Sequence, residues 1–342
     1  MLAMENSNSN PVNFDLLSIG DAAIDVFMTP TESEALCRVD TKECLIAFSY
    51  GEKIPVKNLE FSIGGNAANN AIGTRRLGIS TGIVLTLGED NIGDMIVKKL
   101  KDEGVDATYV IQQPSTTSNY STIINYQGER TIFVYHAPRS YEFPVHLPAA
   151  PWVYLTSMGE SFRPFYNHMA LWLKNNPQIK LAFNPGSWQM RADFNDIKEI
   201  VALTHILFVN REEAEKLTNF GESHDKEREL LIALSRLGPK VSIVTDGAKG
   251  SFAYDSLNGK FFKAGVFPID AYERTGAGDA FGSGVLSALI HARPLEEALL
   301  WGTCNSTSVI GYTGSQRGLL TFDEMNTWLA RAKSGGLGVV QF

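Results

Sequence analysis

From about residue 150 onward, short runs of β-branched and aromatic residues alternate with amphipathic stretches. Residues 164–175 and 212–220 have apolar positions at helical spacing, and Gly221 follows the second stretch as a stop signal. Strand–helix alternation at this interval predicts a parallel sheet that is covered by helices on both faces. The segments expected to be its strands are 16–19, 82–87, 152–156, 179–184, 205–210 and 240–245.

Two segments break this alternation. Residues 26–61 contain apolar stretches without a helical pattern, and in 117–135 the runs STIINY and TIFVY flank a turn-like QGER, which is typical of a hairpin. We expect these strands to form a small accessory sheet, although edge strands of the main sheet would also explain them. The chain is interpreted as one α/β domain, residues 14–342, with lid segments at about 26–61 and 117–136 and a disordered tail at 1–13.

Composition argues against several classes of function. The net charge of -8 argues against nucleic acid as a partner, since phosphate contacts need clustered Lys and Arg. No apolar run approaches the roughly 20 residues that span a bilayer, and residues 1–13 lack the pattern of a secretory signal. The three cysteines Cys37, Cys44 and Cys304 are odd in number and show no CxxC spacing, which favours reduced thiols and a cytoplasmic location.

The strongest chemical signal is the run RTGAGDAFGSG at residues 274–284. Apolar positions at helical spacing follow it, so Gly276 and Gly278 sit where a helix begins. The first N–H groups of a helix lack intrahelical partners and, together with the helix dipole, favour an anion. Asp279 would lie beside that anion and could take a proton from a hydroxyl nucleophile. Taken alone, it is explained as well by the dipole, which favours an acid in the first turn.

Two further clusters carry polar groups suited to a small ligand. In GGNAANNA, residues 64–71, Gly65 permits close backbone approach, and Asn66 and Asn69 share one helix face where they could bind vicinal hydroxyls. Helix capping would also explain Asn66. Asp25, in GDAAID, follows the first expected strand, at the sheet edge where open α/β sheets bind ligands.

Together these motifs resemble those of the ribokinase, or PfkB, family of carbohydrate kinases over nearly the whole chain. GGNAANNAIGTRRLG followed by LGEDNIGD resembles the N-terminal signature of the family, and DAYERTGAGDAFGSGVLSAL resembles the C-terminal one. NREE at 210–213 resembles the NxxE motif, and TDGAKG at 245–250 resembles the nucleotide-contacting T-x-G-x-x-G segment. The resemblance implies a ribokinase-like three-layer sandwich with a mostly parallel central sheet, plus a small β-sheet lid that closes over the sugar.

The resemblance also implies an activity, the ATP-dependent phosphorylation of a hydroxyl, expected to be a primary CH2OH, of a small sugar. Asp279 would be the catalytic base, and the anion hole would consist of Gly276, Ala277 and Gly278. The residues expected to contact the sugar are Asp25, Gly65, Asn66 and Asn69. The residues expected at the nucleotide site are Asn184, Asn210, Glu213, Thr245, Gly247, Gly250 and Asn305. Mg²⁺ is expected near Glu213, held through water.

The chain departs from the family pattern at Glu273, which replaces an aspartate of the monovalent-cation site in several relatives, so K⁺ is left open as a cofactor. Asn184 is explained equally well by an Asn-Pro-Gly turn. Relatives often dimerise through the lid, and the same homodimer is an expectation here.

The acceptor is less constrained than the chemistry. A sugar-phosphate kinase would use a lid arginine, Arg130 or Arg139, and a nucleoside kinase would use aromatic residues such as Phe133. A non-catalytic sugar sensor on the same fold is the alternative outside enzymes, and the intact GAGD argues against it.

Overall fold

The computed structural model describes residues 14–31, 34–38, 43–126, 129–269 and 271–342. The tail expected at residues 1–13 and the hairpin turn at 127–128 lie outside the described residues. In this part of the chain, no helix is both long and apolar enough to cross a bilayer.

The main sheet has ten strands within the described residues, in the order β16-β15-β14-β13-β12-β11-β10-β1-β6-β7. Every neighbouring pair from β13 to β7 is parallel, whereas β14, β15 and β16 are added antiparallel at one edge. The predicted parallel sheet is therefore confirmed, and it contains all six predicted strands. The strands are β1 Leu16–Gly20, β6 Thr81–Gly88, β7 Asp106–Gln113, β10 Trp152–Leu155, β11 Lys180–Phe183, β12 Thr204–Asn210, β13 Val241–Thr245, β14 Ser251–Asp255, β15 Lys260–Ala264 and β16 Val339–Gln341.

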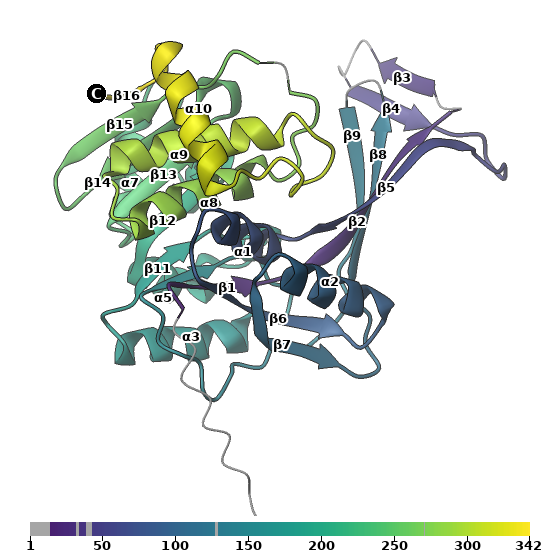
Figure 1. Cartoon of the computed structure of the whole chain (residues 1–342), viewed down its shortest axis with the longest axis horizontal. Coiled ribbons are helices and arrows are strands. Elements are labelled where there is room, and N and C mark those ends of the chain that lie inside the picture. The colour runs from purple at the N-terminus through teal and green to yellow at the C-terminus, as the bar shows by residue number, and fades with distance from the viewer. Residues whose placement is uncertain (1–13, 32–33, 39–42, 127–128, 270) are drawn as a thin grey trace, which may run out of the picture.

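Alternate residues of each parallel strand pack on opposite faces of this sheet, because side chains alternate along a strand. In β1, Leu17 and Ile19 join one buried cluster and Leu16 joins another. Helices cover both faces and make three layers (Figure 1). The first face carries α3 Arg163–Asn175, α5 Lys198–Leu203, α6 Arg211–Thr218 and α7 Glu227–Ser235. The second carries α1 Asn66–Arg76, α2 Asn91–Asp102, α8 Ala277–Ile290, α9 Leu295–Val309 and α10 Phe322–Ser334.

One predicted helix end differs from the structure. Helix α6 ends at Thr218, before the predicted end at residue 220, and Asn219 takes the left-handed conformation with φ 49°, as Gly221 also does with φ 75°. Asparagine tolerates this conformation better than most residues with a side chain, so the helix stops two residues early.

A second sheet, called the lid here, stands apart from the main sheet (Figure 1). It contains, in spatial order, β5 Val56–Gly64, β2 Ala23–Pro30, β8 Asn119–Tyr126 and β9 Glu129–Tyr135. The predicted hairpin is confirmed, because β8 and β9 pair antiparallel, and the separate sheet excludes edge strands of the main sheet. A small hairpin of β3 Glu34–Arg38 and β4 Glu43–Ala47 lies at the outer end of the lid.

The two faces of the lid differ in character. Asp25 lies opposite Ser121 across β2 and β8, and Ser121 lies opposite Val134 across β8 and β9. These three residues face the main domain and line a cavity there. Their strand neighbours, such as Phe133 and Tyr135, lie on the outer face and are about half exposed.

Candidate active site

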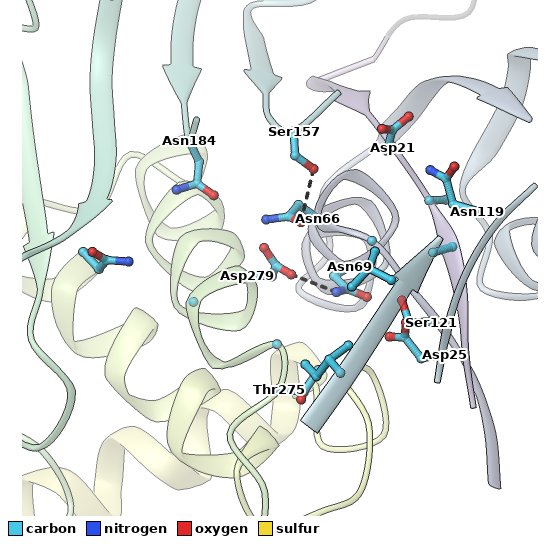
Figure 2. A pocket seen from close by; sticks show the side chains of 18 of the residues that line it. Asp21, Asp25, Asn66, Asn69, Asn119, Ser121, Ser157, Asn184, Thr275 and Asp279 are labelled. Atoms are coloured by element: carbon cyan, nitrogen blue, oxygen red, sulfur yellow. Dashed lines mark hydrogen bonds between the residues drawn. The ribbon is translucent and has the colours of Figure 1, made fainter. Parts of the chain in front are cut away.

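A cavity of about 440 Å³ lies between the lid and the main domain, and it is called the lid cavity here. Residues at the carboxyl ends of neighbouring parallel strands line it, namely Asp21 after β1, Ser157 after β10, Asn184 after β11, Asn210 at the end of β12 and Thr245 at the end of β13. Ligands bind at this edge in open α/β sheets. The arrangement brings together polar groups that are distant in sequence (Figure 2).

Asp279 lies at the centre of this site, as the third residue of α8. Its carboxylate Oδ2 accepts a hydrogen bond of 2.8 Å from Nδ2 of Asn69. The amide of Asn69 is itself fixed, because its Oδ1 accepts from Oγ of Ser315 at 2.8 Å and from Nε2 of Gln316 at 3.0 Å. Asn69 therefore holds the Asp279 carboxylate in place, in addition to lining the cavity.

The surroundings of Asp279 make it a stronger base than an ordinary aspartate. Burial, helped by the nearby Asp25 carboxylate, raises its pKa to about 6 against the lowering effect of hydrogen bonds from Asn69 and Asn66. Burial likewise raises the pKa of Asp25 to about 6, despite a hydrogen bond from Ser121. A carboxylate with this pKa is still ionised at neutral pH, and it accepts a proton more readily than a solvated one.

The start of α8 forms a candidate anion site beside Asp279. Gly276 precedes the helix in the left-handed conformation, with φ 79°, and a Cβ there would collide with Ser315. The N–H of Ala277 closes a turn onto the carbonyl of Arg274 at 3.3 Å. The first-turn N–H groups of Gly278 and Asp279 have no intrahelical acceptor, and nothing lies within 4 Å of a Cβ built on Gly278. An anion can therefore approach closely at Gly278.

The expected sugar-binding residues also lie along the lid cavity. Gly65 has φ 90°, and a Cβ on it would lie 2.5 Å from Cα of Ala22. A Cβ on the preceding Gly64 would collide with the Asp25 carboxylate. Asn66 accepts a hydrogen bond of 3.3 Å from Oγ of Ser157. Gly65 thus permits the turn from β5 into α1 close against Ala22, and Gly64 leaves room for the Asp25 carboxylate.

Several functional candidates were missed by the sequence reasoning. Asp21 lines the cavity nearly buried, and the hydroxyl of Tyr141 lies 3.0 Å from each of its carboxylate oxygens. Burial raises the pKa of Asp21 to about 6. The lining also includes Asn119, Ser121 and Ser157. The sequence did contain a signal for Asn119 and Ser121, because residues two apart in the predicted hairpin strand share one face.

Three of the expected nucleotide residues, Thr245, Gly247 and Gly250, line a second cavity of about 480 Å³. It meets the lid cavity at Thr245, Gly278 and Phe281. Its lining also includes apolar side chains that suit a flat ring, Val266, Phe267, Ile269 and Ile310. The junction of the two cavities therefore lies next to Asp279 and at the candidate anion site.

Three other expected nucleotide residues lie on the lid cavity near this junction. Asn210 caps α6, its Oδ1 accepting from the N–H of Glu213 while Oε2 of Glu213 accepts from the N–H of Asn210, each at 2.9 Å. Asn184 donates to the carbonyl of Phe208 at 2.8 Å. The structure does not bring Asn305 to either cavity, because it is fully buried and bonds Ala280, Ser283 and Leu320.

A divalent cation can be held here only with few protein ligands. The described residues contain no group of three or more His, Cys, Asp or Glu side chains placed to bind a metal directly. Glu213 lines the cavity near the junction, and burial raises its pKa. A hydrated Mg²⁺ fits this setting, since Mg²⁺ usually keeps several waters and binds one or two carboxylates together with phosphates.

Known proteins share both the sequence pattern and the fold. The sequence profile described as pfkB family carbohydrate kinase matches residues 15–321. A 5-dehydro-2-deoxygluconokinase of Lacticaseibacillus casei is 23% identical, over 95% of this chain and 98% of its own. An ATP-dependent 6-phosphofructokinase of Thermoanaerobacterium thermosaccharolyticum is 25% identical, over 88% of this chain and 89% of its own. The structure of Arabidopsis thaliana ribokinase complexed with ribose and ATP matches with a TM-score of 0.76 and 20% sequence identity. The match covers 93% of this chain and 99% of that one.

Proposed function

The chain belongs to the pfkB family of carbohydrate kinases, and from this we propose that it transfers the γ-phosphoryl group of ATP to a primary hydroxyl of a small sugar. Membership makes it a phosphotransferase with an alcohol group as acceptor. The observation that carries the finer proposal is the position of Asp279, at the junction of the two cavities and beside the open N–H groups of α8.

The proposed reaction is an in-line transfer. Asp279 takes the proton of the sugar hydroxyl while the hydroxyl oxygen forms a bond to the γ-phosphorus. The bond between the γ-phosphorus and the bridging β-phosphate oxygen breaks, and ADP is released. The N–H groups at Gly278 and Asp279 stabilise charge on the transferring group. When bound, Mg²⁺ would neutralise phosphate charge, and Glu213 would hold it through water. The lid segments, about 26–61 and 117–136, would close over the sugar and exclude water.

The test is ATP-dependent ADP release against a panel of acceptors with Mg²⁺, with Asp279→Asn as the blank. The panel is ribose, fructose, 2-keto-3-deoxygluconate, fructose 6-phosphate, adenosine, inosine and cytidine. One strong acceptor supports the proposal, and a nucleoside or sugar phosphate in that place would favour the alternative kinases. Folded protein that binds ATP yet uses no acceptor would instead favour a sensor. The assay is run with and without K⁺, because Glu273 pairs with Arg130 in the structure.

Turnover is expected to fall as the pH drops through about 6, because the base must be ionised and the pKa of Asp279 is raised to about 6. The measurement is kcat as a function of pH with a saturating acceptor. In Asp25→Asn the acid limb should move to lower pH, since the Asp25 carboxylate raises the pKa of Asp279. An acid limb that does not move in this variant would contradict the assigned coupling.

We also propose a homodimer through the outer face of the lid. Four half-exposed apolar side chains share this face, namely Leu59, Phe61, Phe133 and Tyr135. Apolar patches of this kind mark association surfaces. Sedimentation at micromolar concentration should show a dimer that Phe61→Glu combined with Phe133→Glu converts to monomer, whereas Leu171→Glu on α3 leaves it intact. A monomeric wild-type protein would contradict the proposal.

A cytoplasmic location also remains a proposal, and the odd number of cysteines without a CxxC spacing supports it.

A further inference from the structure

The charges that line the lid cavity are strongly unbalanced. Four carboxylates line it, those of Asp21, Asp25, Glu213 and Asp279. Among the described lining residues, Arg130 is the one side chain with a fixed positive charge. His136 also lines the cavity, but burial and the nearby Arg139 lower its pKa and favour the neutral ring. Such a cavity attracts hydroxyl groups and repels anions.

Arg130 is not free to offset this charge. Its Nη1 lies 2.6 Å from Oε1 of Glu273, across the space between the lid and the main domain. Glu273 is nearly buried, and the same oxygen accepts from the N–H and the hydroxyl of Thr275, at 2.8 and 2.6 Å. The loop that leads into α8 therefore fixes the carboxylate that holds Arg130.

Arg139, the other arginine considered for a phosphate group, is also engaged. Arg139 is nearly buried, and its guanidinium donates to the carbonyls of Thr86 and Thr117 and to Oδ1 of Asn119. It is not among the residues that line the lid cavity. Arg130 and Arg139 are thus both occupied by protein acceptors.

We propose that the acceptor is an uncharged polyhydroxyl compound, a free sugar and not a sugar phosphate or a sugar acid, and that Glu273 determines this choice by withholding Arg130. The inference rests on the proposed kinase function. The hydroxyls of such a sugar find hydrogen-bond partners at Asp21, Asp25, Asn119 and Ser121, which line the inner face of the lid and the end of β1. The phosphates of the donor, close to the same cavity, would add to the repulsion of an anionic acceptor.

The test compares matched acceptors that differ in charge, fructose and fructose 6-phosphate, by calorimetric binding and by kcat/KM. We expect the wild-type protein to prefer the uncharged member by roughly 100-fold or more, since placing like charges together is costly. Tighter binding of fructose supports the inference even where turnover fails, and a lack of turnover with every acceptor counts against the kinase proposal alone. Tighter binding of fructose 6-phosphate, or binding of neither sugar, overturns the inference.

Variants then separate Glu273 from the general charge of the cavity. Glu273→Gln should release Arg130 and reduce the preference for the uncharged sugar at least about tenfold. Arg130→Gln in the same chain should restore the preference, whereas Arg130→Gln alone should change it little. Asp21→Asn gives an independent check, because removing one carboxylate should also reduce the preference. A preference that stays unchanged in both Glu273→Gln and Asp21→Asn overturns the assignment.

Discussion

Asp279→Asn is expected to lower kcat by roughly 10² to 10⁴-fold, the range that general bases contribute. Asparagine keeps the size of the side chain but cannot take the proton of the acceptor hydroxyl. The amide can still meet Asn69, whose own partners Ser315 and Gln316 are unchanged, so the fold should remain. Steady-state turnover with the best acceptor measures the loss, and thermal unfolding checks the fold.

The matched control for this change is Asp323→Asn, which removes a first-turn carboxylate from α10, outside both cavities. It should leave kcat within about twofold of wild type, since surface substitutions away from a site have small effects. Near-normal turnover in Asp279→Asn would remove Asp279 from the role of base. A comparable loss in both variants would point to an effect on the helices, not on proton transfer.

Two glycines at the start of α8 should lose different properties when they are replaced by alanine. Gly276→Ala places a side chain at φ 79°, which costs about 1–2 kcal/mol, and the new Cβ lies 2.7 Å from Cα of Ser315. Overpacking of this kind costs about 1–3 kcal/mol more. Because Ser315 also fixes Asn69, the base should be displaced in any molecules that do fold. Urea unfolding should therefore show a large loss of stability.

Gly278→Ala should fold normally, because nothing lies within 4 Å of its Cβ and alanine is favoured in a helix by up to about 1 kcal/mol. Its methyl group would instead occupy the junction of the two cavities. We expect kcat to fall by roughly 10²–10³-fold, as when an oxyanion donor is lost. Equal stability losses in the two variants, or full activity in Gly278→Ala, would contradict the placement of the anion site.

Much of the fold could be predicted because its signals are local. Strand–helix alternation predicted the parallel strands, and two runs of strand-forming residues on either side of a turn predicted the hairpin at 117–135. The antiparallel edge was not predicted. The hairpin of β14 and β15 is local but was not identified in the sequence, and β16, which pairs with β15, lies beyond three helices in the sequence. Local patterns predict that a strand exists, but not which neighbour it takes in the sheet.

The candidate site divides in the same way. Asp279 and the glycines before it lie in one contiguous motif, so the sequence alone could identify them. The contacts that hold the site together join residues far apart in the sequence. Ser315 is separated from Asn69 by 246 residues, and Arg130 from Glu273 by 143. Asn305 shows the converse, because a residue suggested by its position within a motif region turned out to bond the interior of the fold.

The two faces of strand β9 constrain how the sequence of this protein can evolve. Its inward residues, Arg130, Ile132 and Val134, line the lid cavity, and the alternating residues Phe133 and Tyr135 form the outer surface. Point mutations can therefore alter acceptor choice and self-association independently. A one-residue insertion or deletion in this strand exchanges the two faces and changes both properties at once. Natural variation along β9 should accordingly be rich in substitutions and poor in length changes.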